Sequence, residues 1–360
     1  MDTIKGKKIL FINLPFFNYE KIIKVELENS GAEVDYFPAV FHKESVKANA
    51  FVSPIIPLLY FLLNPFYKSK YTNKVIHFVK NQNKVYDYLF VIQPLPASKK
   101  LITELKRINP QFKSYIYFWD SFDFYDFAHQ IKWFDYAYSF DKMDCKKHKG
   151  LRHIHNFYID NSAKKEEDII YDFSYIGSVY PFSTYKIGIV AKLVEDAKQQ
   201  RLNYFALMKF YDNFSNGLFG INHILFRIMK KGYLFLFDNP RIRYRKELEE
   251  NLSKGFLTRT GIPLEETIKI QNQSKAIIDV SYRDRGGITF NAIAAVAYNK
   301  KLITTNQYIA NESFYHPNNI LILDEYHPHI DKNFLNSPLV PVDISHLKLD
   351  NWLKTIFNVQ

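Results

Sequence analysis

Short apolar runs alternate with amphipathic stretches along the first half of the chain. The runs KKILFINL (7–14), AEVDYFPAV (32–40), YLFVIQ (88–93), SYIYFW (114–119) and FDYAYSFD (134–141) predict strands, and residues 19–29 and 97–108 predict helices because apolar side chains recur there at helical spacing. Strands that alternate with helices are typical of a parallel sheet covered on both faces.

The same alternation starts again after the charged segment NSAKKEED (161–168). Strands are predicted at 169–178, 203–211, 276–282 and 301–306, and helices at 183–200, 241–255, 262–274 and 288–300. A chain of 360 residues is long enough for two domains. We therefore predict an α/β protein with domains at residues 1–160 and 161–345, and an amphipathic helix at 346–360 that packs back across the boundary.

Composition supports a folded protein in a reducing compartment. Apolar residues make up 47% of the chain, and its single cysteine, Cys145, cannot form an internal disulfide, so we expect a cytoplasmic location. A nucleophilic role for Cys145 is disfavoured. The apolar segment 53–67 contains prolines and is shorter than a bilayer span, which indicates a buried or interfacial helix and leaves contact with the inner face of the cytoplasmic membrane as an alternative.

The net charge of +11 is concentrated in the first 150 residues, which hold 22 Lys and Arg against 15 Asp and Glu. A basic surface suits anionic lipid, a phosphorylated acceptor or nucleic acid, and a simply solvated surface is the alternative. Because no DNA-binding or RNA-binding signature is present, we expect no nucleic-acid partner.

The stretch SYRDRGGITFNAIAAVAYNKKLITTN (281–306) carries the strongest chemical signal. Gly286 and Gly287 permit positive φ and close backbone approach, while Thr289 is placed to cap the next helix or to donate to a phosphate. Arg283 and Arg285 add donors suited to phosphate oxygens. A strand, glycine loop and helix in this order predict an anion site at the helix N-terminus, with an ordinary tight turn as the alternative.

Neither common phosphate loop occurs in the chain. The dinucleotide pattern G-x-G-x-x-G and the Walker pattern G-x-x-x-x-G-K-[ST] are both absent from the sequence. Their absence disfavours a nicotinamide oxidoreductase and a P-loop enzyme.

The residues resemble a known family. SKAIIDVSYRDRGGITFNAIAAVAYNKKLITTN followed by FYHPNNILIL is similar to the C-terminal domain of bacterial lipopolysaccharide and capsule glycosyltransferases of the GT-B type, and the resemblance extends to residues 115–123, 136–151 and 172–185. It implies two Rossmann-like domains facing across a cleft, with the nucleotide-sugar donor bound mainly by the second and the acceptor mainly by the first.

The resemblance also implies roles for particular residues. It makes Gly177 and Ser178, which end a predicted strand, neighbours of the donor phosphates, with a tight turn as the alternative. It places a ribose-binding acid on the helix after the glycines, but this chain has Ala294 there and Asn291 one turn earlier. We expect Asn291 to contact the donor, and this departure leaves a non-catalytic binding protein open.

An inverting transferase needs a base that deprotonates the acceptor, and we expect it just after a strand of the first domain. A retaining transferase, which the sequence leaves open, needs no such base. Asp120 is our first candidate, ahead of Asp123 and Asp126, and helix capping is its alternative role. His153 and His155 alternate on a predicted strand and favour packing between domains over a metal site.

We therefore predict a glycosyltransferase that moves a sugar from a nucleotide-diphosphate sugar to a surface-glycan acceptor, free or lipid-linked. No D-x-D motif occurs, so we expect no metal ion and no cofactor beyond the nucleotide-sugar co-substrate. The alternatives are a non-catalytic sugar-nucleotide or glycan-binding protein on the same fold and a sugar-nucleotide epimerase.

Overall fold

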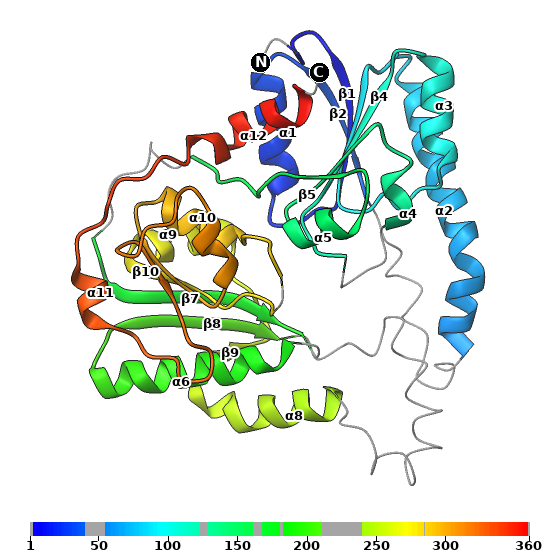
Figure 1. Ribbon diagram of the computed structural model, residues 1–360. Helices are drawn as coiled ribbons and strands as arrows, with labels where there is room; N and C mark the ends of the chain where they lie inside the picture. Colours follow the sequence, from blue (N-terminus) through cyan, green and yellow to red (C-terminus); the bar gives the residue numbers. More distant parts are fainter. Residues whose placement is uncertain are drawn as a thin grey trace.

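The two predicted sheets are present, and every strand pairing within them is parallel. The computed structural model describes residues 3–39, 55–122, 128–160, 168–180, 183–210, 240–283 and 285–358. Each sheet has six strands, and helices cover both faces of each sheet (Figure 1). The α/β fold class expected from the sequence is confirmed.

The first sheet has the strand order β2-β1-β3-β4-β5-β6. Its strands are β1 (Lys8–Asn13), β2 (Glu33–Pro38), β3 (Tyr88–Ile92), β4 (Lys113–Phe118), β5 (Tyr136–Ser139) and β6 (Leu151–His153). The helices of this part are α1 (Tyr19–Asn29), α2 (Ile55–Asn81), α3 (Lys100–Ile108), α4 (Ala128–Ile131) and α5 (Lys142–Lys147).

The second sheet has the strand order β12-β11-β10-β7-β8-β9. Its strands are β7 (Tyr171–Val179), β8 (Tyr204–Phe210), β9 (Leu257–Thr258), β10 (Ser274–Asp279), β11 (Lys301–Thr304) and β12 (Ile320–Ile322). The α-helices are α6 (Tyr185–Gln200), α8 (Pro240–Asn251), α9 (Leu264–Asn272), α10 (Phe290–Ala297), α11 (Lys332–Asn336) and α12 (Leu349–Phe357), and the short 3-10 helices are η4 (Leu252–Lys254), η5 (Gln307–Asn311) and η6 (Ser345–Leu347).

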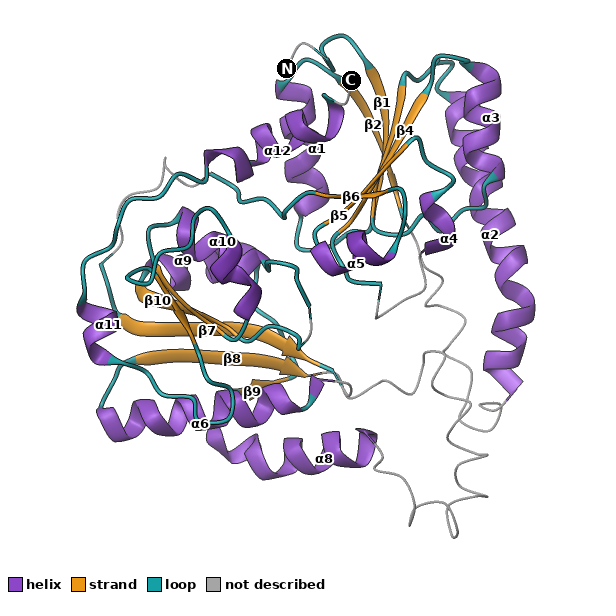
Figure 2. Ribbon diagram, in the orientation of Figure 1, coloured by secondary structure: helices purple, strands orange, loops and turns teal. Residues whose placement is uncertain are grey.

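Continuous apolar runs form the strands because both faces of each sheet are buried. In β1, Leu10 and Ile12 belong to the core on the side of α2 and α3, while Ile9 and Phe11 belong to the core on the side of α1 and α12. Figure 2 shows these two layers of helices on either side of the first sheet. The alternation of side chains across a strand gives each face its own core.

The C-terminal helix α12 packs on the first domain, as predicted. Trp352, Leu353, Ile356 and Phe357 are each no more than 2% exposed and lie in the core beside α1. The chain therefore crosses between the domains twice, and the two crossings are hydrogen-bonded to each other: Tyr158 N–H donates to Leu347 O at 3.0 Å, and Leu349 N–H donates to Tyr158 O at 3.0 Å.

The apolar segment at residues 53–67 coincides with the start of α2, which is helical from Ile55. The side chains of residues 55–65 lie outside the described part, so the prediction that they are buried or interfacial stays a prediction. Of the helices in the described ranges, none combines the length and apolar character that crossing a bilayer requires.

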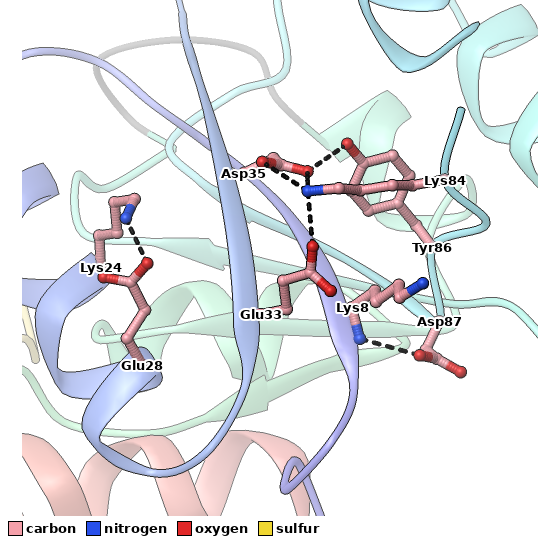
Figure 3. A network of polar contacts seen from close by, with 8 residues as sticks. All are labelled: Lys8, Lys24, Glu28, Glu33, Asp35, Lys84, Tyr86 and Asp87. Carbon is pink, nitrogen blue, oxygen red and sulfur yellow. Dashed lines mark hydrogen bonds and ion pairs between the residues drawn. The ribbon is translucent and has the colours of Figure 1, made fainter. Parts of the chain in front are cut away.

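A network of charged and polar side chains lies at the amino-terminal ends of the strands of the first sheet (Figure 3). Lys84 Nζ lies 2.6 Å from Glu33 Oε1 and 3.0 Å from Asp35 Oδ2, and the Tyr86 hydroxyl donates a hydrogen bond to Asp35 Oδ2 at 2.7 Å. Lys8 N–H donates to Asp87 at 2.8 Å. These contacts tie the edge strand β2 to the segment before β3, far from the carboxyl ends of the strands.

Candidate functional site

A buried carboxylate organises the loop that follows β10. Asp279, the last residue of the strand, accepts hydrogen bonds from the hydroxyls of Ser281, Thr289 (2.8 Å) and Thr304 (3.0 Å). Because its partners come from the loop itself, from the start of α10 and from β11, this carboxylate holds the two ends of the loop, at Ser281 and Thr289, against β11.

Gly286 and Gly287 pack against the first domain. Gly286 N–H donates to Asp141 Oδ1 at 3.3 Å, and a Cβ placed on Gly287 would lie 2.3 Å from Cε2 of Phe140. Neither glycine has positive φ, so the conformational freedom inferred from the sequence is not what the fold uses. Their missing side chains allow the loop after β5 to approach, while contact with phosphate stays a prediction.

Thr289 and Asn291 hold the start of α10. The Thr289 hydroxyl accepts a hydrogen bond from Ala292 N–H at 3.1 Å, which is the capping role considered from the sequence. The Asn291 amide donates to Ile176 O at 2.9 Å and accepts from Gln271 at 3.1 Å. These bonds fasten the helix to the end of β7.

Gly177 and Ser178 lie within β7, near its carboxyl end. A Cβ on Gly177 would come within 2.6 Å of Tyr175 Oη, so this position requires glycine for close packing. Ser178 is partly buried and pairs in register with Lys209. Their predicted contact with donor phosphates stays a prediction.

The two arginines of the loop have different surroundings. Arg283 Nε lies 3.0 and 2.9 Å from the two carboxylate oxygens of Glu325, and its guanidinium stacks 4.2 Å from the Tyr185 ring centre. The Arg285 guanidinium lies 4.7 Å from the centre of the Tyr282 ring, and its charge partly opposes the rise that burial causes in the pKa of Asp120. Arg283 is thus engaged within its own domain, whereas Arg285 faces the first domain.

Lys186 is a site residue that the sequence reasoning missed. Its ammonium lies 3.5 Å from the centre of the Tyr282 ring, the ring that Arg285 also faces. Burial lowers the pKa of Lys186 to about 7, and the charge of Arg285 adds to this effect while Asp279 opposes it. The sequence did contain a signal, because Lys186 shares the apolar face of its helix with Ile189, Val190 and Leu193.

Asp120 follows β4, and beyond the effect of burial its charge contributes to raising the pKa of Tyr282, whose ring Arg285 and Lys186 face. Burial raises the pKa of its carboxyl, against the opposing effects of a hydrogen bond from Gln93 and the charge of Arg285. Arg285 thus interacts electrostatically with Asp120 of the first domain and with Lys186 of the second, and both cations lie over the Tyr282 ring. Asp123 and Asp126, and the segment that Asp120 was considered to cap, lie at residues 123–127, outside the described part.

His153 and His155 belong to a charged contact between the domains. Their ring centres are 4.5 Å apart, and His155 Nε2 lies 3.1 Å from Glu312 of the second domain. Glu312 also pairs with Lys142 at 2.6 Å. Burial lowers the pKa of His153 to about 4, with further lowering by His155 and Lys142. The placement agrees with the interdomain role that the sequence favoured.

The remaining candidate groups are the single cysteine and the side chains that could bind a metal ion. Burial raises the pKa of Cys145 to about 12, with Asp144 and Asp141 adding to the effect, so the thiolate is disfavoured at neutral pH. Across the residues that the structure describes, no group of three or more His, Cys, Asp or Glu side chains is arranged to hold a metal ion.

The hollows of the surface differ in position. One of about 290 Å³ opens between the loop after β1 and the start of α9, so residues of both domains line it. Another, of about 560 Å³, lies over Tyr171 and Phe205 against the side of α9. The second hollow is lined by none of the predicted site residues and lies toward the amino ends of β7 and β8.

Comparison with known proteins supports the fold. No protein-family model and no curated protein matches the chain. The solved N-terminal domain of trehalose-6-phosphate phosphatase from Candida albicans is similar over 97% of this chain and 95% of its own length, with 10% identity and a TM-score of 0.50. This likeness and the two facing parallel sheets agree with the GT-B architecture that the sequence predicted.

Weaker similarities are found to other solved structures. UDP-GlcNAc 2-epimerase from Methanocaldococcus jannaschii, in complex with UDP-GlcNAc and UDP, aligns over 98% of this chain and 93% of that chain at 10% identity and a TM-score of 0.46. MurG from Acinetobacter baumannii aligns over 83% of this chain and 78% of that chain at 9% identity and a TM-score of 0.38. At such identities the likeness concerns the fold alone.

Proposed function

We propose that this protein is a GT-B glycosyltransferase that moves a sugar from a nucleotide-diphosphate sugar to a glycan acceptor. The observation that carries the proposal is that Arg285 and Lys186 of the second domain both lie over the Tyr282 ring, while Asp120 of the first domain acts electrostatically on Arg285 and on Tyr282. Cations and a buried carboxylate gathered around one ring, near the carboxyl ends of parallel strands, suit a reaction in which a diphosphate leaves and a hydroxyl is deprotonated.

The cations have the electrostatic task. As the glycosidic bond to the diphosphate breaks, negative charge develops on the leaving oxygens, and Arg285 and Lys186 stabilise it at low reorganisation cost because they are already held against Tyr282. Arg283, bound to Glu325, holds the loop in shape. The backbone of Gly286 and Gly287, with Gly177, Ser178, Thr289 and Asn291, completes the donor side of the proposed site.

Asp120 has the proton-transfer task. Its raised pKa brings the carboxylate closer to the pH at which a base is most effective, and Gln93 orients it. The proposed reaction uses no metal ion and no further cofactor, because the side chains themselves neutralise the diphosphate. Activity that is unchanged by a chelator is the expected result.

The acceptor is the part of the proposal that rests on the resemblance to lipopolysaccharide and capsule enzymes. We propose a surface glycan, free or lipid-linked, handled at the inner face of the cytoplasmic membrane, with no nucleic-acid partner. The basic first 150 residues support an anionic partner of this kind.

Two alternative functions can be told apart from a transferase by the products they release. Asn291 is committed to Ile176 and Gln271, and alanine occupies position 294, so the described part of α10 offers no acid for a ribose, which favours a non-catalytic binding protein. An epimerase on this fold would convert a free nucleotide sugar to its epimer. A transferase would release the nucleoside diphosphate, and a binding protein would release neither product.

A thermal-shift titration with nucleoside diphosphates and their sugars, without metal, tests the donor site, because a ligand that binds the folded state raises its melting temperature. We expect one nucleotide base to be selected. Lys186→Met and Arg285→Ala should each weaken its binding about tenfold or more, since each removes a charge-assisted contact. Lys246→Met and Arg107→Ala, which alter exposed ion pairs, serve as controls.

The pH dependence gives a sharper test of Lys186. A pKa of about 7 means that the free protein loses the ammonium as pH rises through 7, so diphosphate affinity should fall up to about tenfold for each pH unit above that value. Lys186→Arg keeps its charge and should remove this component. Equal pH profiles for wild type and Lys186→Arg would exclude Lys186 from the diphosphate site.

A further inference from the structure

The 290 Å³ hollow between the domains combines aromatic and acidic side chains. Its lining consists of Pro15, Phe16, Phe17, Asn18 and Glu20 from the first domain and Pro263 and Leu264 from the second. Ligand pockets typically hold roughly 300–1,000 Å³, so this hollow fits a single small ring rather than a whole nucleotide sugar.

Two exposed phenylalanines form one corner of the hollow. Phe16 is 45% and Phe17 is 46% exposed, although adjacent large apolar side chains are normally covered. Their ring centres are 4.5 Å apart with an angle of 86° between the planes, and Phe16 also contacts Trp119 at 6.1 Å. The rings therefore present one face and one edge at a right angle, a shape that suits a saturated ring better than a flat base held between parallel faces.

The backbone at this corner is strained. Phe17 has φ of 50° and Asn18 has φ of 62°, which is the left-handed region. A bulky residue such as phenylalanine adopts this conformation rarely and at a cost on the order of 1–3 kcal/mol. Such strain concentrates at binding and catalytic sites, where it holds side chains in a useful orientation.

Glu20 supplies the polar group of the hollow. Its side chain belongs to the first turn of α1 and the residue is 6% exposed. One carboxylate oxygen, Oε2, accepts a hydrogen bond from Phe16 N–H at 3.1 Å. Within the described ranges, Oε1 has no hydrogen-bond partner and is not among the fully buried polar atoms, so a ligand in the hollow can reach it.

We propose that this hollow binds one pyranose ring of the glycan acceptor, with its C–H face on Phe16 and Phe17 and a hydroxyl donating to Glu20. This inference rests on the proposed function. The Glu20 carboxylate repels a diphosphate and accepts hydrogen bonds from hydroxyl groups, so the hollow selects a neutral sugar over the charged part of the donor. Pro263 and Leu264 close the hollow from the second domain, so the ring is enclosed only when both domains are present.

Saturation-transfer NMR with the methyl β-glycosides of glucose, galactose and N-acetylglucosamine tests the proposal. At least one glycoside should receive saturation from wild type. Phe16→Ala and Glu20→Gln should reduce its affinity about fivefold or more, because they remove the stacking face and the charged acceptor. Phe66→Ala is the matched control, since Phe66 is 63% exposed on α2, which covers a different face of the first domain.

The outcomes separate the two proposals. No saturation of any glycoside, or equal affinity in wild type and both variants, overturns the sugar site. Nucleotide binding is measured on the same samples by thermal shift. Nucleotide binding without glycoside binding would overturn only the proposed sugar site. Absence of nucleotide binding would overturn the proposed function instead.

Other occupants give their own results. Displacement of the glycoside by the selected nucleotide sugar, but not by the free nucleotide, would assign the ring to the donor and overturn the acceptor assignment. Binding to anionic phospholipid vesicles that is lost in Phe16→Ala, without any glycoside signal, would assign the two phenylalanines to a membrane surface and also overturn it.

Discussion

Replacing Gly287 with alanine tests whether position 287 requires glycine because of the contact between the domains. The added Cβ would lie 2.3, 2.7 and 2.9 Å from Cε2, Cδ2 and Cζ of the Phe140 ring. Real Cβ atoms do not approach carbon this closely, so the ring and its loop must move. Overpacking of this kind costs roughly 1–3 kcal/mol of folding free energy.

A double-mutant cycle isolates that contact. Phe140→Ala removes the ring, so the Gly287→Ala penalty should largely vanish in the Phe140→Ala background, giving a coupling free energy of about 1–3 kcal/mol. Urea unfolding followed by far-UV circular dichroism supplies the free energies. Gly188→Ala is the control: Gly188 is inside α6, a Cβ there meets no atom within 4 Å, and alanine should stabilise that helix by about 0.5–1 kcal/mol.

Two results would refute this reasoning. An equal penalty for Gly287→Ala with and without the Phe140 ring would place the clash elsewhere. Unchanged stability together with weakened nucleotide binding would mean that Gly287 serves phosphate approach and that the contact with Phe140 is incidental.

Two further predictions concern stability. His153 has a pKa of about 4 in the folded protein and 6.5 as a free side chain, so between these pH values the unfolded state binds more protons and the free energy of unfolding should rise with pH. In melting experiments at different pH, His153→Asn should flatten this slope and the exposed control His346→Asn should not. Equal slopes for the two variants would contradict the assignment. Trp352→Ala should cost about 3–5 kcal/mol in urea unfolding, since Trp352 is 1% exposed, and Tyr326→Ala, at a 65% exposed position, should cost little; similar midpoints for both would contradict the core role of α12.

The central strands and their order of appearance could be predicted because they are buried on both faces, whereas the short edge strands β9 and β12 of the second sheet were not predicted. An apolar run such as YLFVI has few stable alternatives, and β3 was predicted to within one residue. The C-terminal helix was also predicted, because Trp352, Leu353 and Ile356 form an apolar face that needs a partner. Leu347, which the sequence grouped with them, lies instead in η6 and packs in the core of the second domain.

The site was predictable only in part. Asp120 and Arg285 were predicted, since both follow strands at the edge where ligands bind in α/β sheets. The contacts of Gly286 and Gly287 were not, because they depend on Phe140 and Asp141, which are distant in sequence and meet the loop only after the domains dock. The pairing of Arg283 with Glu325 is likewise a tertiary contact that no local pattern encodes.

The return of the chain to the first domain also has a consequence for synthesis. The buried face of α12 fills part of the core beside α1, and α12 follows every strand of the second sheet in the chain. Domains usually fold in order as they emerge. Here the first sheet must wait for a helix that is made after the second domain. The part of its apolar face that α12 covers therefore stays open while the second domain is translated, and a nascent chain that stalls before α12 would expose that part to chaperones.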